Sequence, residues 1–470
     1  MLVPYLWYPS KKSLINSIDH PFRKEIDMFS PSLKTYSTLS VEEKKQLLSR
    51  ETIQNTEISQ AVRNMLERFQ KCSPSSRDAL IQEYTQRFDH IIQDNSLIEK
   101  LSIDEAQKLL GDELTCHIEK ASQAIRLFHK AQKRNHYSVS LHQGEVRCER
   151  LIRPIERVGF YVPGGLAPLF SSLLMMAIPA QLAGCHHLLL CTPPLASGTI
   201  SPLTHGVASL MGIHEIHAIG GAQAIAAMAY GSKEVTAVDK IFGPGNAWVN
   251  EAKLQISAGP SHTSIDLPAG PSEVMVVADH TAQPAFIAAD LLAQAEHGPD
   301  AQVICVLLNS PSTSQLFSDV TYHINQQLNH LSRHDIITSS LKNSGFILAQ
   351  SRKEACTIIN SYAPEHLILQ IDQPRELLPA INHAGSVFLG HQTPESLGDY
   401  ASGTNHILPT AGYGRQYSGL SLEAFEKTIT IQEASLQPHS PLAQTVIGLA
   451  KAEGLDAHAN AMSLRVNTSS

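Results

Sequence analysis

Gln294 and His297 are three residues apart in the segment LLAQAEHGPD. The apolar positions of FIAADLLAQAEH predict a helix that ends near His297, because Gly298 and Pro299 follow it as a stop signal. Side chains three residues apart lie on one face of a helix, so an amide oxygen and an imidazole nitrogen would stand side by side. Such a pair is half of a first coordination shell for Zn²⁺. Taken alone, the pair also fits a surface histidine placed favourably at a helix C-terminus.

A second pair, Glu365 and His366, is adjacent in YAPEHLILQ. Pro364 and the apolar run after the pair predict the mouth of a strand, where both side chains can border a cleft. Histidine titrates near neutral pH and burial tunes the pKa of a glutamate, so the pair could supply two bases of different strength. A surface loop with ordinary charges is the alternative interpretation.

Two further segments carry metal-ligand residue types without an apolar pattern that would explain them as core. PESLGDYASGTNHILPTAGYGRQYSGLS holds Asp399 and His406 in a long Gly- and Ser-rich loop, and loops of this length are usually functional or disordered. Asp399 is a candidate carboxylate ligand. Near the end of the chain, LAKAEGLDAHANA offers Glu453 and His458 among small residues that leave room for close approach.

The helices and strands that position these residues can be predicted from the pattern of apolar and charged residues along the chain. Residues 40–133 show apolar positions at helical spacing among charges, as in HIEKASQAIRLFHKAQK. After Arg157 short aliphatic runs alternate with helical stretches, and a second such series follows Pro271, so we expect two α/β domains with parallel sheets. From about Thr410 the chain is a polar helical tail with too little apolar patterning for its own core, so it must pack on something else, for which another subunit is a candidate.

Three Gly-rich turns, VPGGLAP, IGGAQAIA and FGPGNAW, each follow an apolar strand of the first series. Such turns lie at the carboxyl ends of parallel strands, where backbone amides can approach a phosphate. None of the three is a GxGxxG, and we expect none of the acidic residues beyond them to be placed to hold a ribose. The turns therefore point to a dinucleotide by architecture alone.

Composition narrows the class of protein. The chain has 470 residues, of which 43% are hydrophobic, and a formal net charge of -8, which argues against nucleic acid as a main partner. Its seven cysteines form no CxxC pair, so we expect the reducing cytoplasm and neither a disulfide framework nor a Cys-rich zinc module. Residues 158–214 contain no Asp, Glu, Lys or Arg, but the prolines that interrupt them favour buried strands and helices over a membrane span. The first 27 residues do not resemble a secretory signal, and their role is open.

Eight parts of the chain together resemble the histidinol dehydrogenase family, from about residue 28 to residue 466. They are ERVGFYVPGG, GGAQAIAA, VDKIFGPGNAWV, DLPAGPSEVMVVAD, LLAQAEHGPDAQV, APEHL, AGSVFLG with PESLGDYASGTNH, and AEGLDAHANA. The resemblance implies an enzyme of the last two steps of histidine biosynthesis, which oxidises L-histidinol through L-histidinal to L-histidine. It also implies one Zn²⁺ per subunit, NAD, and a homodimer with shared active sites.

The resemblance also implies roles for individual residues of this chain. The zinc ligands would be Gln294, His297, Asp399 and His458, with His458 coming from the other subunit. His366 would be the general base and Glu365 would activate water. The substrate would be bound by Ser272, Gln294, His297, His366, Asp399, His406, Glu453 and His458, and NAD by Tyr161, Gln223 and Asn246.

The predicted architecture has five segments. Residues 1–27 are an extension, residues 28–156 an N-terminal helical region packing on the second α/β domain, residues 157–270 a first Rossmann-like domain on the NAD side, residues 271–409 a second Rossmann-like domain with the zinc and catalytic residues, and residues 410–470 a C-terminal dimerisation tail. Three alternatives stay open: a dehydrogenase of another amino alcohol, a non-catalytic zinc-binding protein of the same fold, and a thiol mechanism through Cys148 or Cys185.

Overall fold

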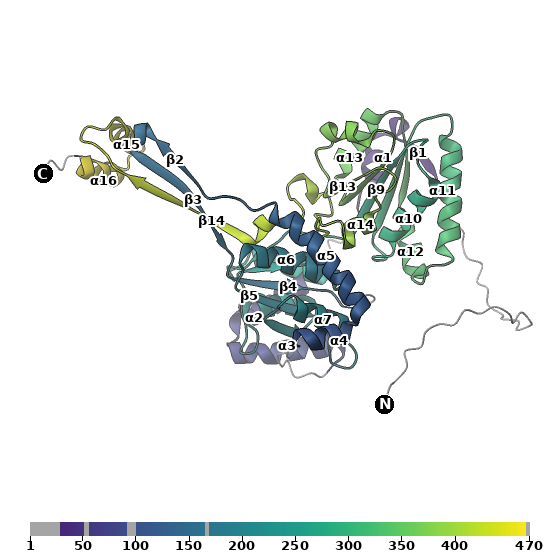
Figure 1. The fold of residues 1–470 in the computed structure, drawn as a ribbon, viewed down its shortest axis with the longest axis horizontal. Coiled ribbons are helices and arrows are strands. Elements are labelled where there is room, and N and C mark those ends of the chain that lie inside the picture. Colours follow the sequence, from purple (N-terminus) through teal and green to yellow (C-terminus); the bar gives the residue numbers. More distant parts are fainter. Residues whose placement is uncertain (1–28, 51–55, 92–99, 165–168, 467–470) are drawn as a thin grey trace, which may run out of the picture.

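The computed structural model describes residues 29–50, 56–91, 100–164 and 169–466. They form two α/β bodies and an arm that projects to one side (Figure 1). Each body is built on a parallel sheet with helices packed against it, which confirms the predicted α/β class. The predicted extension, residues 1–27, lies outside the described residues.

The first sheet has five parallel strands in the order β6-β5-β4-β7-β8. Its strands are β4 (Arg157–Tyr161), β5 (His187–Thr192), β6 (Glu215–Ala218), β7 (Lys240–Phe242) and β8 (Ser264–Ile265), and its helices are α6 (Ser171–Ala183), α7 (Pro202–Leu210), α8 (Gly221–Tyr230) and α9 (Ala247–Ser257). From β4 the chain moves to one side and then, at β7, to the other. The carboxyl ends of β4 and β7 therefore border the topological switch point, where sheets of this kind bind ligands.

The uncharged stretch of residues 158–214 supplies much of the core of this body. Most residues of β4, β5 and α6 are buried, because a sheet covered on both faces by helices must be apolar on both faces. Within the described ranges, no helix combines the length and apolar character needed to cross a bilayer.

The second sheet has six parallel strands in the order β1-β11-β10-β9-β12-β13. Its strands are β1 (Leu33–Thr35), β9 (Glu273–Ala278), β10 (Gln302–Leu308), β11 (Gly345–Ala349), β12 (His366–Gln370) and β13 (Ser386–Leu389), and its helices are α1 (Val41–Leu47), α10 (Pro284–Ala295), α11 (Thr313–Leu328), α12 (His334–Leu341), α13 (Arg352–Tyr362) and α14 (Glu395–Tyr400). Apart from the edge strand β1, this order repeats that of the first sheet, with its reversal between β9 and β12. Both bodies thus have one doubly wound topology.

The N-terminal helices pack on the first body, so the prediction that residues 28–156 pack on the second domain is wrong for them. They are α2 (Thr56–Lys71), α3 (Pro74–Asp89), α4 (Ile103–Leu110) and α5 (Asp112–Lys130). α2 and α3 contact α8, α4 contacts α7, and α5 contacts α6. The reason is the apolar face of α2 and α3, where Val62, Phe69 and Ile81 share one core with Ile225 and Met228 of α8. Of the described elements before Thr56, β1, α1 and the 3-10 turn of residues 36–38 between them belong to the second body.

The arm consists of residues 137–154 and 426–466. Its elements are β2 (Tyr137–Leu141), β3 (Val146–Pro154), β14 (Glu426–Ala434), α15 (Pro441–Ala452) and α16 (Asp456–Val466), and its antiparallel sheet has the order β14-β3-β2. The prediction of a helical tail is therefore wrong for β14, and that of a helical region is wrong for β2 and β3. EKTITIQEA alternates β-branched with polar residues at a period of two, which is the pattern of a strand. The two arm helices pack on each other at the tip (Figure 1).

Five short 3-10 helices complete the regular structure of the described residues. They are η1 (Tyr36–Thr38), η2 (His142–Gly144), η3 (Pro374–Ala380), η4 (Tyr413–Arg415) and η5 (Leu422–Phe425). η5 matters for the architecture, because its Phe425 stacks on Phe242 of β7 with ring centroids 4.1 Å apart. This contact anchors the base of the arm to the first body.

Candidate active site

The paired bases lie at the amino edge of the second sheet. Glu365 immediately precedes β12 and His366 is its first residue. His366 is in register with Val274 of β9 and with Ser386 of β13. Parallel strands begin at a common edge, so Ser272, which directly precedes β9, lies at the same edge. The group therefore lies opposite the carboxyl edge that usually carries ligand loops in such sheets.

His366 is enclosed by acceptors on both sides of its ring. Its Nδ1 lies 3.2 Å from the carbonyl oxygen of Glu273, 3.6 Å from Oε2 of Glu365 and 3.7 Å from Oε1 of Glu395. Its Nε2 lies 3.7 Å from Oδ1 of Asp399. The side chain is 5% exposed. Burial by itself would lower the pKa of His366, but the carboxylates of Glu395 and Glu365 outweigh it and hold that pKa well above its ordinary value.

Glu365 is held by the backbone of the neighbouring strand. Its Oε2 accepts a hydrogen bond of 2.8 Å from the amide of Glu273, and the side chain is buried. Glu273 in turn is paired with Arg50, whose Nη2 donates to Oε2 of Glu273 at 2.8 Å and whose guanidinium lies 3.8 Å from the ring centroid of Tyr362. Burial raises the pKa of Glu273 despite Arg50. Arg50 and Tyr362 therefore hold Glu273 in place, and the backbone amide of Glu273 orients Glu365.

The end of α10 and the short helix α14 form a cluster of ligand types. The side-chain amide of Gln294 lies against the carboxylate of Glu395 on one side and the backbone amide of Glu273 on the other. His297 follows α10 and its Nε2 lies 4.0 Å from Oδ2 of Asp399. Ligand atoms of His297, Glu395 and Asp399 lie within 4.8 Å of one another. The structure thus brings Gln294, His297 and Asp399 together.

The donor set of this cluster fits a zinc ion. One imidazole, one amide oxygen and carboxylates are the ligand types that Zn²⁺ takes, and Nε2 of His366 is buried beside them without a hydrogen-bond partner among the described residues. Burial raises the pKa of Glu395 well above its usual value, whereas His366 holds that of Asp399 below it despite burial. A cation here would offset buried negative charge.

His406 links the cluster to the first body. Its Nδ1 lies 2.7 Å from the carbonyl oxygen of Asp399, and its Nε2 lies 3.1 Å from the hydroxyl of Ser172 in the first turn of α6. Burial lowers the pKa of His406. The adjacent Asn405 donates to the carbonyl of Met175 at 2.7 Å. The carboxyl edge of the first sheet and the amino edge of the second therefore meet at this loop.

The three residues that the resemblance assigns to NAD lie along the carboxyl edge of the first sheet. Tyr161 ends β4, and its hydroxyl accepts a hydrogen bond of 3.1 Å from the amide of Gly221. Gln223 is in the first turn of α8 and is buried. Asn246 caps α9, accepting from the amides of Trp248 and Val249 at 3.1 Å each. They border the switch point between β4 and β7.

Two assigned residues lie elsewhere. Glu453 is the C-cap of α15 and His458 is in α16, and both are exposed near the tip of the arm, on the far side of the molecule from α10 and α14 (Figure 1). The structure of one chain does not bring them to the cluster. Large exposed apolar side chains share the arm with them, namely Tyr137, Val139, Leu141, Ile429, Ile431, Leu449, Leu455 and Leu464.

Sequence reasoning missed Glu395, Glu273 and Arg50. Glu395 is four residues before Asp399, so the helical spacing of the pair was a usable signal. Glu273 is adjacent to Ser272, but its role depends on the hydrogen bond from Arg50. The two residues are 223 positions apart in the chain, and no local pattern encodes such a contact.

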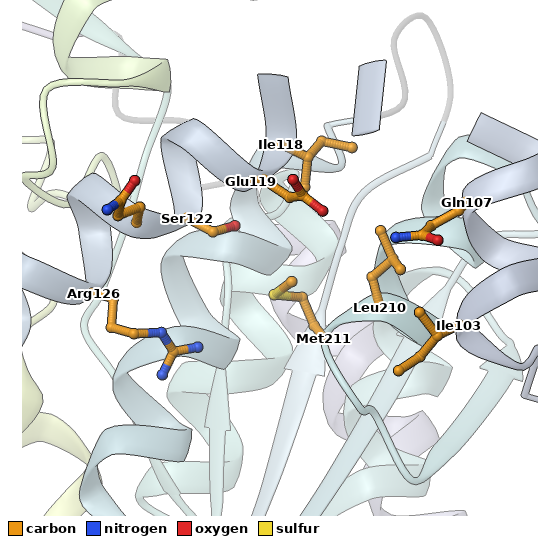
Figure 2. Close-up of a pocket in the computed structure, with 9 residues that line it drawn as sticks. Ile103, Gln107, Ile118, Glu119, Ser122, Arg126, Leu210 and Met211 are labelled. Atoms are coloured by element: carbon orange, nitrogen blue, oxygen red, sulfur yellow. The ribbon is translucent and has the colours of Figure 1, made fainter. Parts of the chain in front are cut away.

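A separate cavity of about 390 Å³ lies between α4, α5 and the end of α7 (Figure 2). It is lined by Ile103, Gln107, Ile118, Glu119, Ser122, Gln123, Arg126, Leu210 and Met211. Arg126 also donates to Oε1 of Gln181 at 3.0 Å. None of the residues of the paired bases or of the ligand cluster lines it, so we assign it no part in their chemistry.

Comparison with known proteins places this geometry in context. Residues 48–466 match the protein-family model described as histidinol dehydrogenase. The chain is 47% identical over 433 residues to the histidinol dehydrogenase of Vibrio parahaemolyticus, covering 92% of this chain and 97% of that protein. It is 47% identical over 436 residues to that of Yersinia pestis, covering 93% and 96%. The crystal structure of histidinol dehydrogenase from Elizabethkingia anophelis superposes with a TM-score of 0.85 at 41% identity, covering 93% of this chain and 98% of that one.

Proposed function

The chain belongs to the histidinol dehydrogenase family and is an oxidoreductase, and from that premise we propose that it oxidises L-histidinol through L-histidinal to L-histidine, with NAD and one zinc ion per subunit. The observation that carries the proposal is the position of His366, with Glu365 beside Nδ1 and the ligand cluster beside Nε2. The chemistry belongs to the last two steps of histidine biosynthesis.

His366 is the proton acceptor of both oxidations. The Glu273 carbonyl, 3.2 Å from Nδ1, supports the tautomer with hydrogen on Nδ1 and a free lone pair on Nε2. In the first oxidation Nε2 takes the hydroxyl proton of the alcohol as the carbon gives a hydride to NAD, which leaves the aldehyde. In the second, it takes a hydroxyl proton of the aldehyde hydrate as a second hydride leaves, which gives the carboxylic acid.

Glu365 activates the water that joins the two oxidations. It removes one proton as the water oxygen bonds to the aldehyde carbon. His366 returns to the aldehyde oxygen the proton that it took in the first oxidation, which completes the hydrate and frees Nε2 for the second. One oxygen of Glu365 is already occupied by the Glu273 amide, which supports a defined orientation of the other. The two bases therefore act at different stages, with His366 used twice.

Zinc would be held by Gln294, His297 and Asp399, with His458 of the partner subunit as fourth ligand. When bound, the ion supplies a positive template for the substrate nitrogens and offsets the carboxylates that raise the pKa of His366. Ser272, His406 and Glu453 of the partner subunit complete the substrate site. NAD would be held by Tyr161, Gln223 and Asn246, and the Ser172–His406 contact supports hydride transfer across the junction of the two bodies.

A homodimer explains the exposed arm. Its strands carry Val139, Ile429 and Ile431 into solvent, and exposed apolar surface of this kind marks a protein interface. An arm that lies against a second copy buries this surface and can deliver Glu453 and His458 to the other chain's cluster.

The test is turnover of the purified protein with L-histidinol. We expect two NADH per L-histidinol consumed, loss of activity with a chelator, and its return on addition of Zn²⁺. Turnover of another amino alcohol but not L-histidinol would favour the first alternative. A zinc-loaded protein with no turnover would favour the non-catalytic one.

A further inference from the structure

The structure supplies an acidic residue for the dinucleotide edge from an unexpected part of the chain. Asp239 and Asp266 follow two of the Gly-rich turns of the first body at about the usual spacing, but they are already paired with Arg157 and Lys253, respectively. Asp89, the last residue of α3, instead reaches this edge from the helices that precede the sheet. Its Oδ2 accepts a hydrogen bond of 3.3 Å from Nε2 of Gln223.

The surroundings of Asp89 are those of a ligand edge. Gln223 lies in the first turn of α8, whose start is packed so closely that a Cβ at Gly221 would stand 2.7 Å from the Gln223 amide oxygen. Tyr161 joins the same group, because its hydroxyl accepts from the Gly221 amide. Asp89 therefore touches one of the three residues assigned to NAD and lies close to a second.

Asp89 has no ion pair with a described Lys or Arg. The guanidinium of the neighbouring Arg87 lies 5.3 Å from the ring centroid of Phe88, and the charged group that acts on the Asp89 carboxylate is the adjacent His90, which is exposed. Asp89 is half-buried, and burial raises its pKa. A carboxylate in this state gains from a hydrogen-bond donor that a ligand brings.

Two aromatic rings extend the edge beside it. Phe88, which is 43% exposed, has its ring centroid 6.0 Å from that of Trp248, at an angle of 42°. Trp248 is two residues after Asn246, in the first turn of α9. The exposed ring of Phe88, backed by the partly buried Trp248 and beside a carboxylate, offers an apolar surface for a nucleobase and an acceptor for its sugar.

We propose that Asp89 accepts a hydrogen bond from the 2′-hydroxyl of the adenosine ribose of NAD and so selects NAD over NADP. This inference rests on the proposed function, in which NAD is the hydride acceptor. NADP carries a phosphate at the 2′ position, which removes the hydroxyl donor and sets a dianion against the carboxylate. The residue is specificity-determining and takes no part in the chemical step.

The competing explanation is structural, with Asp89 serving only to tie α3 to Gln223. Asp89→Asn separates the structural explanation from the proposed one. The Asn side chain keeps an acceptor oxygen for Gln223 but carries no charge. Asp89→Glu keeps the charge. Glu83→Gln is the matched control. It removes a carboxylate from the same helix, and the ion pair that Glu83 forms with Arg68 is exposed.

The experiment is direct titration of the zinc-loaded protein with NAD and with NADP, by calorimetry and by quenching of Trp248 fluorescence, beside steady-state kinetics. We expect the wild-type chain, Asp89→Glu and Glu83→Gln to prefer NAD. Asp89→Asn should reduce the ratio of the NADP Kd to the NAD Kd by about 10- to 100-fold, with kcat for NAD within about twofold.

Two results overturn the inference while leaving the proposed function intact. They are an Asp89→Asn ratio equal to that of the wild type, and a wild-type chain that binds both cofactors equally. A wild-type chain that binds neither overturns both. Should Asp89→Asn melt below the assay temperature, Asp89→Glu decides alone, because loss of the preference for NAD with the charge retained contradicts the proposal.

Discussion

Nε2 of His366 lies 3.7 Å from Oδ1 of Asp399, so the proposed base and a proposed zinc ligand face each other directly. The first residue of β12 and the short helix α14 are thereby joined, although 33 positions separate the two residues in the chain numbering. A change in charge at either residue should shift the pKa of the other, because both are largely buried and the dielectric constant around them is low.

His366→Asn should reduce kcat for L-histidinol by about 100- to 10,000-fold, the usual loss when a general base is removed. The KM should change little, because the base contributes mainly to the transition state. His330→Asn, on the exposed surface of the second body, serves as the control. An Asn variant with normal kcat would remove His366 from the mechanism.

In Glu365→Gln, oxidation of L-histidinal should fall more than the first oxidation, as measured by single-turnover NADH formation.

Glu395→Gln should weaken zinc binding by about 10- to 100-fold, because this carboxylate orients Gln294 and neighbours His297 and Asp399. Competition with a chromophoric chelator measures the zinc Kd without requiring turnover. Glu376→Gln tests the effect of removing an exposed carboxylate that pairs with Arg352 on the same body. An unchanged zinc Kd would mean that Glu395 does not support the ligand cluster.

A mixed dimer tests whether the arm completes the partner's site. His458→Asn and His366→Asn should each be inactive as homodimers, yet co-assembly should restore about a quarter of the wild-type activity. Random assembly makes half of the dimers mixed, and in each mixed dimer one of two sites has both histidines. If His458 acted within its own chain, no mixture would be active. Refolding the two variants together and separately provides the comparison.

Glu215→Gln should make the free energy of unfolding less dependent on pH in the acidic range. Burial opposes ionisation of Glu215, but hydrogen bonds from His217 at 2.8 Å and from the Thr236 amide at 2.9 Å lower its pKa to about 2. A lowered pKa in the folded state gives stability that is present above the unfolded pKa of about 4.5 and lost as pH falls toward 2. The shift corresponds to about 3 kcal/mol.

Urea unfolding at several pH values checks this prediction. The wild-type chain should be more stable than Glu215→Gln at pH 7, and the difference should shrink between about pH 4.5 and pH 2. Glu234→Gln, on a partly exposed carboxylate of the same body, should show no such convergence. A difference that stays constant with pH would assign the effect to packing instead of charge.

Cys185→Ala and Cys148→Ala should both retain oxidation of L-histidinal within about twofold. Burial raises the pKa of the Cys185 thiol to about 12, and its Sγ donates to the carbonyl of Phe425 at 3.7 Å. Almost no thiolate is therefore present near neutral pH to attack an aldehyde. Cys148 lies on β3 of the arm, away from the paired bases. Loss of aldehyde oxidation in either variant would revive the thiol mechanism.

Much of the local structure could be predicted because it depends on short spacings. The helix that ends beside His297 follows from its apolar positions and the Gly-Pro stop, and the alternation of aliphatic runs and helices gave two parallel sheets. The strand β14 was missed although its β-branched alternation was visible. A polar, exposed strand has no buried face, so the usual signal of a core side is weak.

Long-range packing could not be predicted in the same way. Nothing local shows that α2 and α3 cover α8, that Arg50 pairs with Glu273, or that Asp89 contacts Gln223. Each of these contacts depends on how whole surfaces fit together, and the free energy of that fit is shared among many side chains.

The sequence by itself determined the chemical inventory: an amide and an imidazole at a helix end, adjacent bases before an apolar strand, and carboxylates in a loop that lacks a core pattern. Only the tertiary structure decided which of them meet. It gathered Gln294, His297, His366, Glu395 and Asp399 at the amino edge of one sheet and left Glu453 and His458 on the arm. The physical reason is that helix and strand periodicity act over a few residues, whereas sheet order and the docking of helices are set by burial across the whole chain.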